Sequence, residues 1–376
     1  AFTFHLSPFT FELSALSFHL SPFTFQLLVP ISTLFLVHLI PRDIIMARYF
    51  LGVDTGNSKS HALVADEAGR VLGIGMGGCG SPEVLGYEGF GTVLHSLTSE
   101  ALTQAGLSPS QISAAGFGVA GYDWPSQTQP CLERIDALGL GGPSGLVNDA
   151  LVGMLAGAPA GWGVGLVAGT GSNCWGMDKS GRIGRMTGLT FLMDEGGGAG
   201  HLVLWGLQAV GKAYTLRGPQ TMLTELFLQR FGEPDVLSLL QRLSAQRELV
   251  DPSLAPLVMR AAQEGDVVAL EILQQAAESL ASLCLGVARQ LKLEKGLFDV
   301  VLIGGVFQAG ELLIQLLRNV ILDEMPGAHL LRLEAPPVLG GVVLAAKQLG
   351  LKLGQDSLQR LQVESNAYLK DHPQES

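Results

Sequence analysis

A strand–turn–strand pattern that occurs twice constrains this fold more than any other feature of the sequence. The first copy runs from Tyr49–Val53 through the turn Asp54-Thr-Gly-Asn-Ser-Lys59 into Ser60–Ala65, and a third strand is predicted over residues 70–75. The second copy runs from Val164–Val167 through Ala168-Gly-Thr-Gly-Ser-Asn173 into strands predicted over residues 173–177 and 181–186. The second half of the chain is therefore predicted to repeat the first.

Strands and helices alternate around both copies. Helical spacing over 90–106 and 130–138 separates strands predicted at 112–119 and 145–148. Helical segments dominate residues 220–292, and a strand at 298–303 precedes another helix. This order predicts an α/β fold with helices packed on mixed sheets. A chain of 376 residues is long enough for two such domains, which we place at 46–150 and 151–350, followed by a polar tail at 351–376.

Composition excludes several classes of protein. The net charge of -11 argues against a broad nucleic-acid-binding face. Four cysteines (Cys79, Cys131, Cys174 and Cys284) are scattered without a C-x-x-C pair, which argues against a zinc site or a disulfide framework and fits a reducing cytoplasm. Nothing in the composition requires a membrane. We therefore expect a cytoplasmic enzyme that acts on a small molecule.

Residues 1–45 differ from the rest of the chain. Phe4–Leu13 recurs almost unchanged as Phe18–Leu27, and this repeat is too short for a solenoid. The apolar run that follows contains Pro30 and no Lys or Arg precedes it, so it fits neither a secretory signal nor a membrane span well. We expect Met46 to be the natural start and the leader to lie outside the fold. A membrane-binding or partner-binding extension is the alternative.

Two kinds of chemistry lie close together near the middle of the chain. Asp149 follows an apolar run and opens a helix, where its carboxylate can face a cleft as a general base. The glycine turn at 168–173 follows soon after, and its backbone N–H groups and hydroxyls are suited to an anion such as phosphate. Either feature alone is also typical of a helix N-cap or a tight hairpin turn. Their order in the chain favours phosphoryl transfer.

Other polar and glycine-rich positions extend this prediction. Asp54 ends the first strand and can hold magnesium-bound water, and the turn after it offers donors for phosphate oxygens; an ordinary polar hairpin is the alternative. Asp194 and Glu195 precede a glycine run, which suits contacts to substrate hydroxyls or a hinge. Asp123 lies in a loop that can face the cleft, although such a residue is commonly a solvated turn. Gly304-Gly305 ends a buried strand and allows close approach of a flat ring or a phosphate.

With these motifs placed, the chain resembles the N-acetylglucosamine kinase branch of the BadF/BadG/BcrA/BcrD-type ATPases, within the sugar-kinase, heat-shock-chaperone and actin superfamily. The resemblance covers roughly residues 49–350 and rests on the order of its motifs. The motifs are Gly52-Val-Asp-Thr-Gly-Asn-Ser-Lys59, Gly118-Val-Ala-Gly121, Asn148-Asp149-Ala150, Ala168-Gly-Thr-Gly-Ser-Asn173, Asp194-Glu195-Gly196 and Ile303-Gly-Gly-Val-Phe307.

The resemblance implies two actin-like, ribonuclease H-like domains that close on ATP and Mg²⁺ in the cleft between them. It implies that Asp149 is the catalytic base that takes a proton from a sugar hydroxyl, and that Asp54 lies near the magnesium. The positions implied for ATP are Gly56, Asn57, Ser58, Lys59, Gly169, Thr170, Gly171, Gly304 and Gly305. Those implied or suited for the sugar are Ser81, Asp149, Ser172, Asn173, Asp194 and Glu195. A homodimer is left open.

The chain departs from the family pattern at two sugar-contacting positions. A tryptophan that packs on the sugar is replaced by Gly188, and an early asparagine aligns with Ser81. These changes leave phosphoryl transfer in place and question N-acetylglucosamine as the substrate. Two alternatives follow. An ATPase that activates a partner reductase or dehydratase needs cluster-binding cysteines, which the scattered cysteines do not provide. A sugar sensor without turnover is suggested by the missing tryptophan, but no DNA-binding helix-turn-helix accompanies it.

Overall fold

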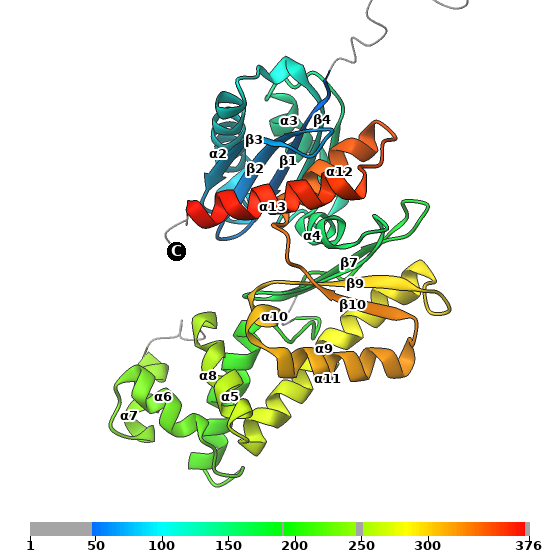
Figure 1. Cartoon of the computed structure of the whole chain (residues 1–376). Helices are drawn as coiled ribbons and strands as arrows, with labels where there is room; N and C mark the ends of the chain where they lie inside the picture. The colour runs from blue at the N-terminus through cyan, green and yellow to red at the C-terminus, as the bar shows by residue number, and fades with distance from the viewer. Residues whose placement is uncertain (1–46, 190–191, 246–250, 373–376) are drawn as a thin grey trace, which may run out of the picture. The chain divides into compact units, whose positions relative to one another are not determined.

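The computed structural model describes residues 47–189, 192–245 and 251–372. The predictions for the leader at 1–45 and for a start at Met46 lie outside the described residues. Within the described part, the elements follow the predicted alternation of strands and helices (Figure 1).

The first sheet has the strand order β3-β2-β1-β4-β5. β1 and β2 are antiparallel, as are β2 and β3, whereas β1, β4 and β5 run parallel. Its strands are β1 (Tyr49–Thr55), β2 (Ser60–Asp66), β3 (Val71–Gly77), β4 (Ile112–Val119) and β5 (Ser144–Asn148). The antiparallel hairpins at one side and parallel strands at the other make it a mixed sheet.

The second sheet repeats this plan, with the order β10-β9-β6-β7-β8. β6 takes the central place of β1, the antiparallel β7 and β8 take those of β2 and β3, and the parallel β9 and β10 take those of β4 and β5. Its strands are β6 (Gly163–Ala168), β7 (Ser172–Met177), β8 (Ile183–Arg185), β9 (Phe298–Ile303) and β10 (Ala328–Arg332). The predicted repeat and the predicted fold class, two mixed sheets with flanking helices, are confirmed.

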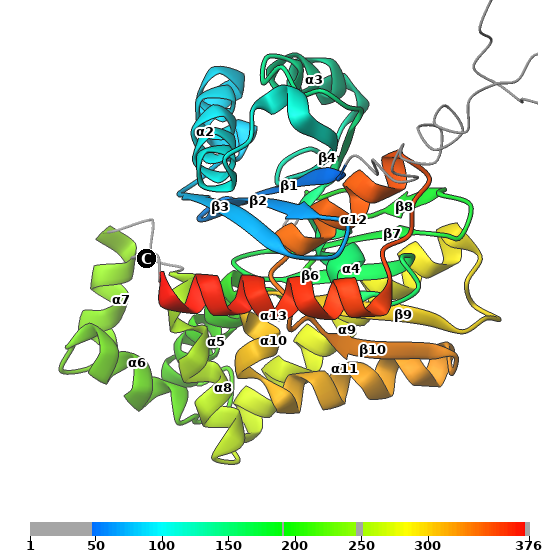
Figure 2. The same cartoon turned by 45° about the horizontal axis from the view of Figure 1, so that its top comes forward.

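Both faces of the first sheet are covered, because side chains alternate along its strands. Leu51 and Val53 of β1 face a cluster with α2 and α3, whereas Phe50 faces a cluster with α12 and α13. All three side chains are fully buried. Figure 2 shows α12 and α13 beside β1–β3 on the side away from α2. These helices are α2 (Pro82–Ala105), α3 (Thr128–Asp136), α12 (Val338–Gln348) and α13 (Gln355–Asp371).

Most remaining helices surround the second sheet. Helix α9 packs on β6 and β7, and its apolar residues form the largest cluster together with α5, α6, α8 and α11. By length and apolar composition α9 can cross a membrane, but 56% of its most apolar window is buried inside the structure. The helices are α4 (Asp149–Gly157), α5 (Ala199–Tyr214), α6 (Leu223–Phe231), α7 (Val236–Ala245), α8 (Ala255–Gln263), α9 (Val267–Leu291), α10 (Gly305–Ala309) and α11 (Glu311–Glu324). Short 3₁₀ turns are η1 (Pro109–Gln111), η2 (Pro125–Gln127) and η3 (Pro252–Leu254).

Two helices each follow a strand of one sheet in the sequence but pack on the other sheet. α4 follows β5 of the first sheet but packs on the second, where its Met154 joins Ile303 in one buried cluster. α12 follows the second sheet but packs on the first, so closely that a Cβ at Gly52 would lie 2.5 Å from the Val342 backbone N. The two helices also touch each other, since a Cβ at Gly340 would lie 1.8 Å from the Val152 carbonyl oxygen. These contacts join the two halves of the described chain.

The end of the chain differs in form from the polar tail expected from its composition. Residues 355–371 form helix α13, and its Leu361 is fully buried in the cluster under the first sheet. The Glu364 carboxylate also accepts a hydrogen bond of 2.8 Å from the Val71 backbone N–H. The polar face of the helix is exposed, which explains why composition alone indicated a tail.

Candidate functional site

The register of the first sheet brings three strand ends into one row. Thr55 of β1 lies opposite Val119 of β4, which lies opposite Asn148 of β5. Because these parallel strands end at the same edge, the residues around Asp54, those after Val119 and Asp149 all meet there. The β6–β7 turn of the second sheet faces the same space.

The space is a cavity of about 540 Å³. Its lining comes from both halves of the described chain: the β1–β2 turn, the start of α2, the β4–η2 loop, the start of α4, and the β6–β7 turn. The lining residues are Asn57, Ser58, Glu83, Ala120, Gly121, Asp123, Asp149, Val167, Gly169, Thr170, Gly171, Ser172, Asn173 and Gly188. A volume of this size is in the range of small-molecule sites.

Asp149 is held at the first position of α4 by its neighbour. Asn148 is the N-cap, and its Oδ1 accepts a hydrogen bond of 2.9 Å from the Ala150 N–H. The Asn148 amide in turn donates to Asp123 Oδ1 at 3.2 Å. One oxygen of Asp149 also accepts from the Ala150 N–H at 3.0 Å, so the carboxylate is fixed beside the helix start. Asn148 therefore positions two carboxylates at once.

The carboxylates at this edge repel one another. Burial raises the pKa of Asp149 to about 6, and the negative charge of Asp123 adds to the effect. Burial and the charge of Glu83 raise the pKa of Asp123 to about 6. The pKa of Asp54 is raised to about 8 by burial and by the charge of Asp149. A group that is ionised near pH 7 but binds a proton readily has the acid–base character of a general base.

The glycine turn between β6 and β7 is tied to the start of a long helix. The Gly169 N–H donates to the Gly171 carbonyl at 3.0 Å, closing the turn. The N–H groups of Ala199 and Gly200, in the first turn of α5, donate to the carbonyls of Gly169 and Thr170 at 2.9 and 3.0 Å. The positive end of the α5 dipole thus lies behind the turn, and both features favour an anion in front of it.

A second cavity of about 370 Å³ shares Gly169 and Thr170 with the first. Its other walls are mainly apolar and come from η3, α8 and α10, with Pro252, Pro256 and Met259 among them, together with Gly305. Gly304 next to it has φ of 111°, and a Cβ there would lie 2.4 Å from the Ala168 carbonyl oxygen. Only glycine allows β9 and the turn to approach this closely. The two cavities meet at the glycine turn, so one elongated molecule can occupy both.

Some of the predicted ATP positions line the two cavities, and others stabilise the turns around them. Asn57, Ser58, Gly169, Thr170, Gly171 and Gly305 line one or both cavities. Gly56 supports the β1–β2 turn through a 3.0 Å hydrogen bond from its N–H to the Lys59 carbonyl. The side chain of Lys59 is exposed, and neither cavity includes it among its lining residues.

At several predicted sugar positions the side chain makes hydrogen bonds within the protein. The hydroxyl of Ser81 is buried and donates to the Ala120 carbonyl at 3.1 Å. The hydroxyl of Ser172 donates to the Glu195 carbonyl at 2.6 Å, although the residue does line the cavity. The Glu195 carboxylate is buried and accepts from the backbone N–H groups of Thr187 and Gly188 at 2.7 and 2.8 Å. These three residues thus shape the walls of the cavity.

Asn173 and Asp194 behave differently from one another. Asn173 lines the cavity and hydrogen-bonds Asp123, which lowers the pKa of that carboxyl against the larger effect of burial. Asp194 is exposed, lies outside the lining, and has a left-handed φ of 56°, which is uncommon for a residue other than glycine. In this conformation of the chain Asp194 does not reach the cavity.

Two carboxylates were not assigned to the site by sequence reasoning. Glu83 starts α2 and lines the cavity beside Gly121, whose added Cβ would lie 2.5 Å from Glu83 Cγ. The sequence left Asp123 either facing the cleft or as a solvated turn residue, and in the structure it lines the cavity. Its backbone carbonyl accepts a hydrogen bond from Arg185, whose guanidinium lies over the rings of Trp124 and Trp175 at 4.7 and 5.2 Å. The sequence signal for Glu83 was only its place directly after Pro82 at a helix start.

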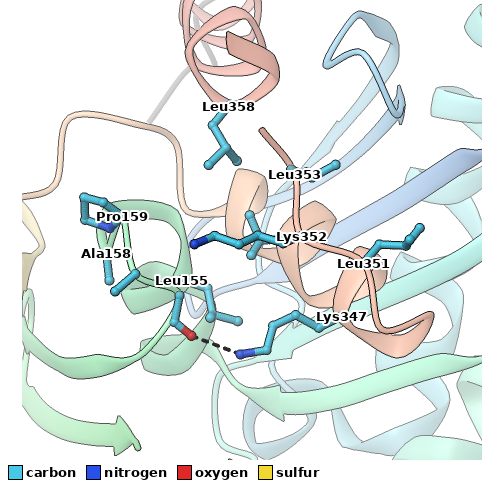
Figure 3. A pocket seen from close by; sticks show the side chains of 11 residues that line it. Leu155, Ala158, Pro159, Lys347, Leu351, Lys352, Leu353 and Leu358 are labelled. Atoms are coloured by element: carbon cyan, nitrogen blue, oxygen red, sulfur yellow. Dashed lines mark hydrogen bonds between the residues drawn. The ribbon is translucent and has the colours of Figure 1, made fainter. Parts of the chain in front are cut away.

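A separate cavity of about 170 Å³ lies between the end of α4, the end of α12 and α13 (Figure 3). Its lining is mostly apolar, and Lys347 Nζ donates to the Gly161 carbonyl at 2.9 Å. None of the predicted site residues lines it. Its described lining holds no carboxylate and none of the turn at 168–173, so the candidate active site is the pair of cavities that share Gly169 and Thr170.

Similar proteins of known function include sugar kinases. An N-acetylmuramic acid/N-acetylglucosamine kinase of Clostridium acetobutylicum is 26% identical over 304 residues, covering 80% of this chain and 99% of that protein. An N-acetyl-D-glucosamine kinase of Dictyostelium discoideum is 27% identical over 312 residues, covering 79% and 97%. The crystal structure of a proposed N-acetylglucosamine kinase from Chromobacterium violaceum shares the fold, with a TM-score of 0.60 and 24% identity over 79% of this chain and 98% of that one.

A family model also matches the chain over residues 51–345, which is more than half of its length and includes both sheets. The sequence resemblance is therefore confirmed, and the chain belongs to the BadF/BadG/BcrA/BcrD ATPase family.

Proposed function

We propose that this protein is an ATP-dependent kinase that phosphorylates a hydroxyl of an amino sugar. The observation that carries the proposal is the position of Asp149, which lines a sugar-sized cavity that continues across a glycine turn into a second, apolar cavity. The two similar proteins that act as N-acetylglucosamine kinases support the same reading. The resemblance to these kinases suggests N-acetylglucosamine as the first sugar to test.

In the proposed reaction the nucleoside of ATP occupies the apolar cavity and its phosphates cross the turn at Gly169–Gly171. The backbone N–H groups there and the α5 dipole bind the phosphate oxygens. Ser58 and Thr170 add hydroxyl donors from opposite sheets. Phosphoryl transfer depends mainly on positioning and charge neutralisation, so these groups are placed to bring the γ-phosphate towards the sugar.

Asp149 is proposed as the general base. It accepts the proton of the sugar hydroxyl as that oxygen bonds to the γ-phosphorus and the bond from phosphorus to the ADP oxygen breaks. Its pKa of about 6 leaves it ionised at neutral pH. Asn148 caps the start of α4 and so keeps the Asp149 carboxylate there, which positions the base before the substrate binds.

Asp54 fits a magnesium ion. Its ionised form is disfavoured by burial and by the charge of Asp149, and a divalent cation relieves both effects. Among the described residues no group of three or more metal-binding side chains is arranged to hold an ion by itself. Magnesium typically uses one or two carboxylates with phosphate oxygens and water, so a single carboxylate is sufficient here. When bound, the ion would neutralise phosphate charge.

The remaining proposals concern the whole protein. The predicted domain division at residue 150 falls within α4, which suits a hinge that closes on the substrates. A small-molecule sugar is the expected partner, in the cytoplasm and without nucleic acid or membrane. A homodimer stays a prediction.

The function is tested by ADP release from MgATP with N-acetylglucosamine, glucosamine, N-acetylmannosamine and glucose. We expect sugar-dependent release that Asp149→Asn lowers by several orders of magnitude while ATP binding persists. Asp136→Asn, which removes an exposed carboxylate at the end of α3, is the matched control and should retain full activity. ADP release that does not depend on any sugar indicates a partner-activating ATPase instead, and sugar binding without release indicates a sensor.

A further inference from the structure

All the charged side chains that line the larger cavity among the described residues are negative. Three carboxylates line it, from three different elements: Glu83 from α2, Asp123 from the β4–η2 loop and Asp149 from α4. No lysine, arginine or histidine is among its described lining residues. None of the three carboxylates takes part in an ion pair within the described chain. The cavity is therefore negative towards whatever enters it.

Other charged groups nearby do not reverse this sign. The negative charges of Asp54 and Asp149 repel each other, and the charge of Glu195 likewise acts on Asp123. Arg185 is the nearby cation and offsets part of the charge of Asp123. Its guanidinium is held over Trp124 and Trp175 and donates to a backbone carbonyl, so it does not neutralise Glu83 or Asp149.

The wall at Gly188 adds a second, independent observation. Gly188 lines the cavity with a left-handed φ of 77°, and a Cβ there would lie 3.3 Å from Asp123 Cγ. Gly188 therefore places no side chain against the Asp123 carboxylate. The aliphatic side chains of the described lining are Ala120 and Val167.

We propose that the cavity selects a cationic 2-amino-2-deoxyhexose, such as glucosamine, over the neutral N-acetylated sugar, with Glu83 as the specificity-determining residue. This inference rests on the proposed kinase function and narrows its substrate class. An ammonium group is attracted by the three carboxylates, of which Asp123 is partly offset by Arg185, whereas a neutral acetamide is not. A sugar that carries a carboxylate, such as N-acetylmuramic acid, meets repulsion from the same groups.

Glu83 is the carboxylate to change, because Asp149 is the proposed base and Asp123 is hydrogen-bonded to Asn148. The experiment measures kcat/KM for glucosamine, N-acetylglucosamine and N-acetylmuramic acid with the full chain and with Glu83→Gln. We expect the unchanged protein to prefer glucosamine and to use N-acetylmuramic acid least. Glu83→Gln should lower kcat/KM for glucosamine about two- to fivefold, as for a partly solvated charge pair, and leave that for N-acetylglucosamine unchanged or higher.

Two controls separate a direct effect from a structural one. Glu88→Gln removes the same charge from the same helix, but at a side chain that does not line the cavity and that pairs with Arg134, and it should not change the sugar preference. Glu83→Asp should restore most of the preference for glucosamine. Higher ionic strength should reduce the preference in the unchanged protein and have little effect in Glu83→Gln, because screening acts on charge and not on shape.

The outcomes are distinct from those that test the kinase itself. Turnover that favours N-acetylglucosamine, with a ratio that Glu83→Gln does not alter, overturns the inference while leaving the kinase proposal intact. If no sugar is turned over, the kinase proposal fails and the inference is judged by binding alone. Calorimetry with glucosamine and N-acetylglucosamine must then show tighter binding of the amine that is lost in Glu83→Gln, and equal affinities would overturn the inference.

Discussion

At the scale of single residues, the carboxylates near the two sheet edges make opposing demands on stability and catalysis. Asp54, Asp123 and Asp149 all have raised pKa values, so each is more favourable in the folded protein when it is protonated. The unbound protein therefore keeps charges that destabilise it. Such a cost is expected where a base, a metal and a substrate amine supply the missing partners.

The sign of the pH dependence follows for Asp54. The pKa of Asp54 is about 8 in the folded protein, whereas an aspartate without these surroundings has a pKa of 3.8. The folded chain therefore binds this proton more tightly than the unfolded chain does. Its stabilising contribution is complete below about pH 4 and is lost as the pH rises to about 8. Asp54→Asn should therefore be more stable than the unchanged protein at pH 8.5, by about 1–3 kcal/mol after allowing for partial exposure, with the gain shrinking towards pH 5. Urea unfolding without nucleotide or magnesium measures this, and an equal difference at both pH values would contradict it.

Asp149 gives a second pH dependence, in the rate. A base with a pKa of about 6 is inactive when protonated, so kcat/KM should rise with pH through about 6 and then level off. The substrate amine must also be protonated for the preference proposed above. The ratio of glucosamine to N-acetylglucosamine turnover should therefore fall again at alkaline pH, while turnover of the acetylated sugar stays level. A flat profile between pH 5 and 7 would remove Asp149 from the role of base.

At the scale of elements, the sequence pattern predicted the limits of strands better than it predicted which groups the side chains hydrogen-bond. The limits of β4 and β9 were predicted to the residue, because alternating or continuous apolar runs end at clear polar or glycine turns. Helix α13 was missed because its buried positions (Leu361 and Ser365) and its half-buried ones (Leu358 and Tyr368) form a narrow stripe in a polar segment. The spacing of these positions was the available signal.

The hydrogen-bond partners within the site were not predictable in the same way. Ser81 is bonded to Ala120 and Ser172 to Glu195, and both contacts join segments that are distant in the sequence. A sequence shows that a hydroxyl is present but not whether its proton is already donated to the protein. Ser81 and Ser172 were therefore assigned to the sugar from the resemblance, whereas in the structure their hydroxyls fix the cavity wall.

The packing of α13 predicts a measurable contribution to stability. Leu361 is fully buried against the first sheet, so Leu361→Ala should lower the free energy of unfolding by about 2–4 kcal/mol. Val363 on the same helix is 61% exposed, and Val363→Ala should change it by less than about 0.5 kcal/mol. Urea unfolding of both variants decides the matter. Equal and small effects would show that α13 does not stabilise the first sheet.

At the scale of the whole molecule, the exchange of α4 and α12 couples the base to the rest of the fold. Asp149 is the first residue of α4, and α4 packs on the second sheet and against α12, which covers the first. Any movement of the two halves therefore passes through the helix that carries the base. The closest point of this coupling is Gly340, where a Cβ would lie 1.8 Å from the Val152 carbonyl oxygen.

Gly340→Ala tests this coupling against a matched substitution. Backbone cannot yield as a flexible side chain does, so the added methyl should push α4 and α12 apart, lower the thermal midpoint by several degrees and reduce kcat more than it raises KM for ATP. Gly211 is also a helical glycine, in α5, and has no atom within 4 Å of its would-be Cβ. Gly211→Ala should therefore keep full activity and gain up to about 1 kcal/mol from helix propensity. If Gly340→Ala lost stability but kept its kcat, the contact between the helices would serve packing alone and the base would not depend on it.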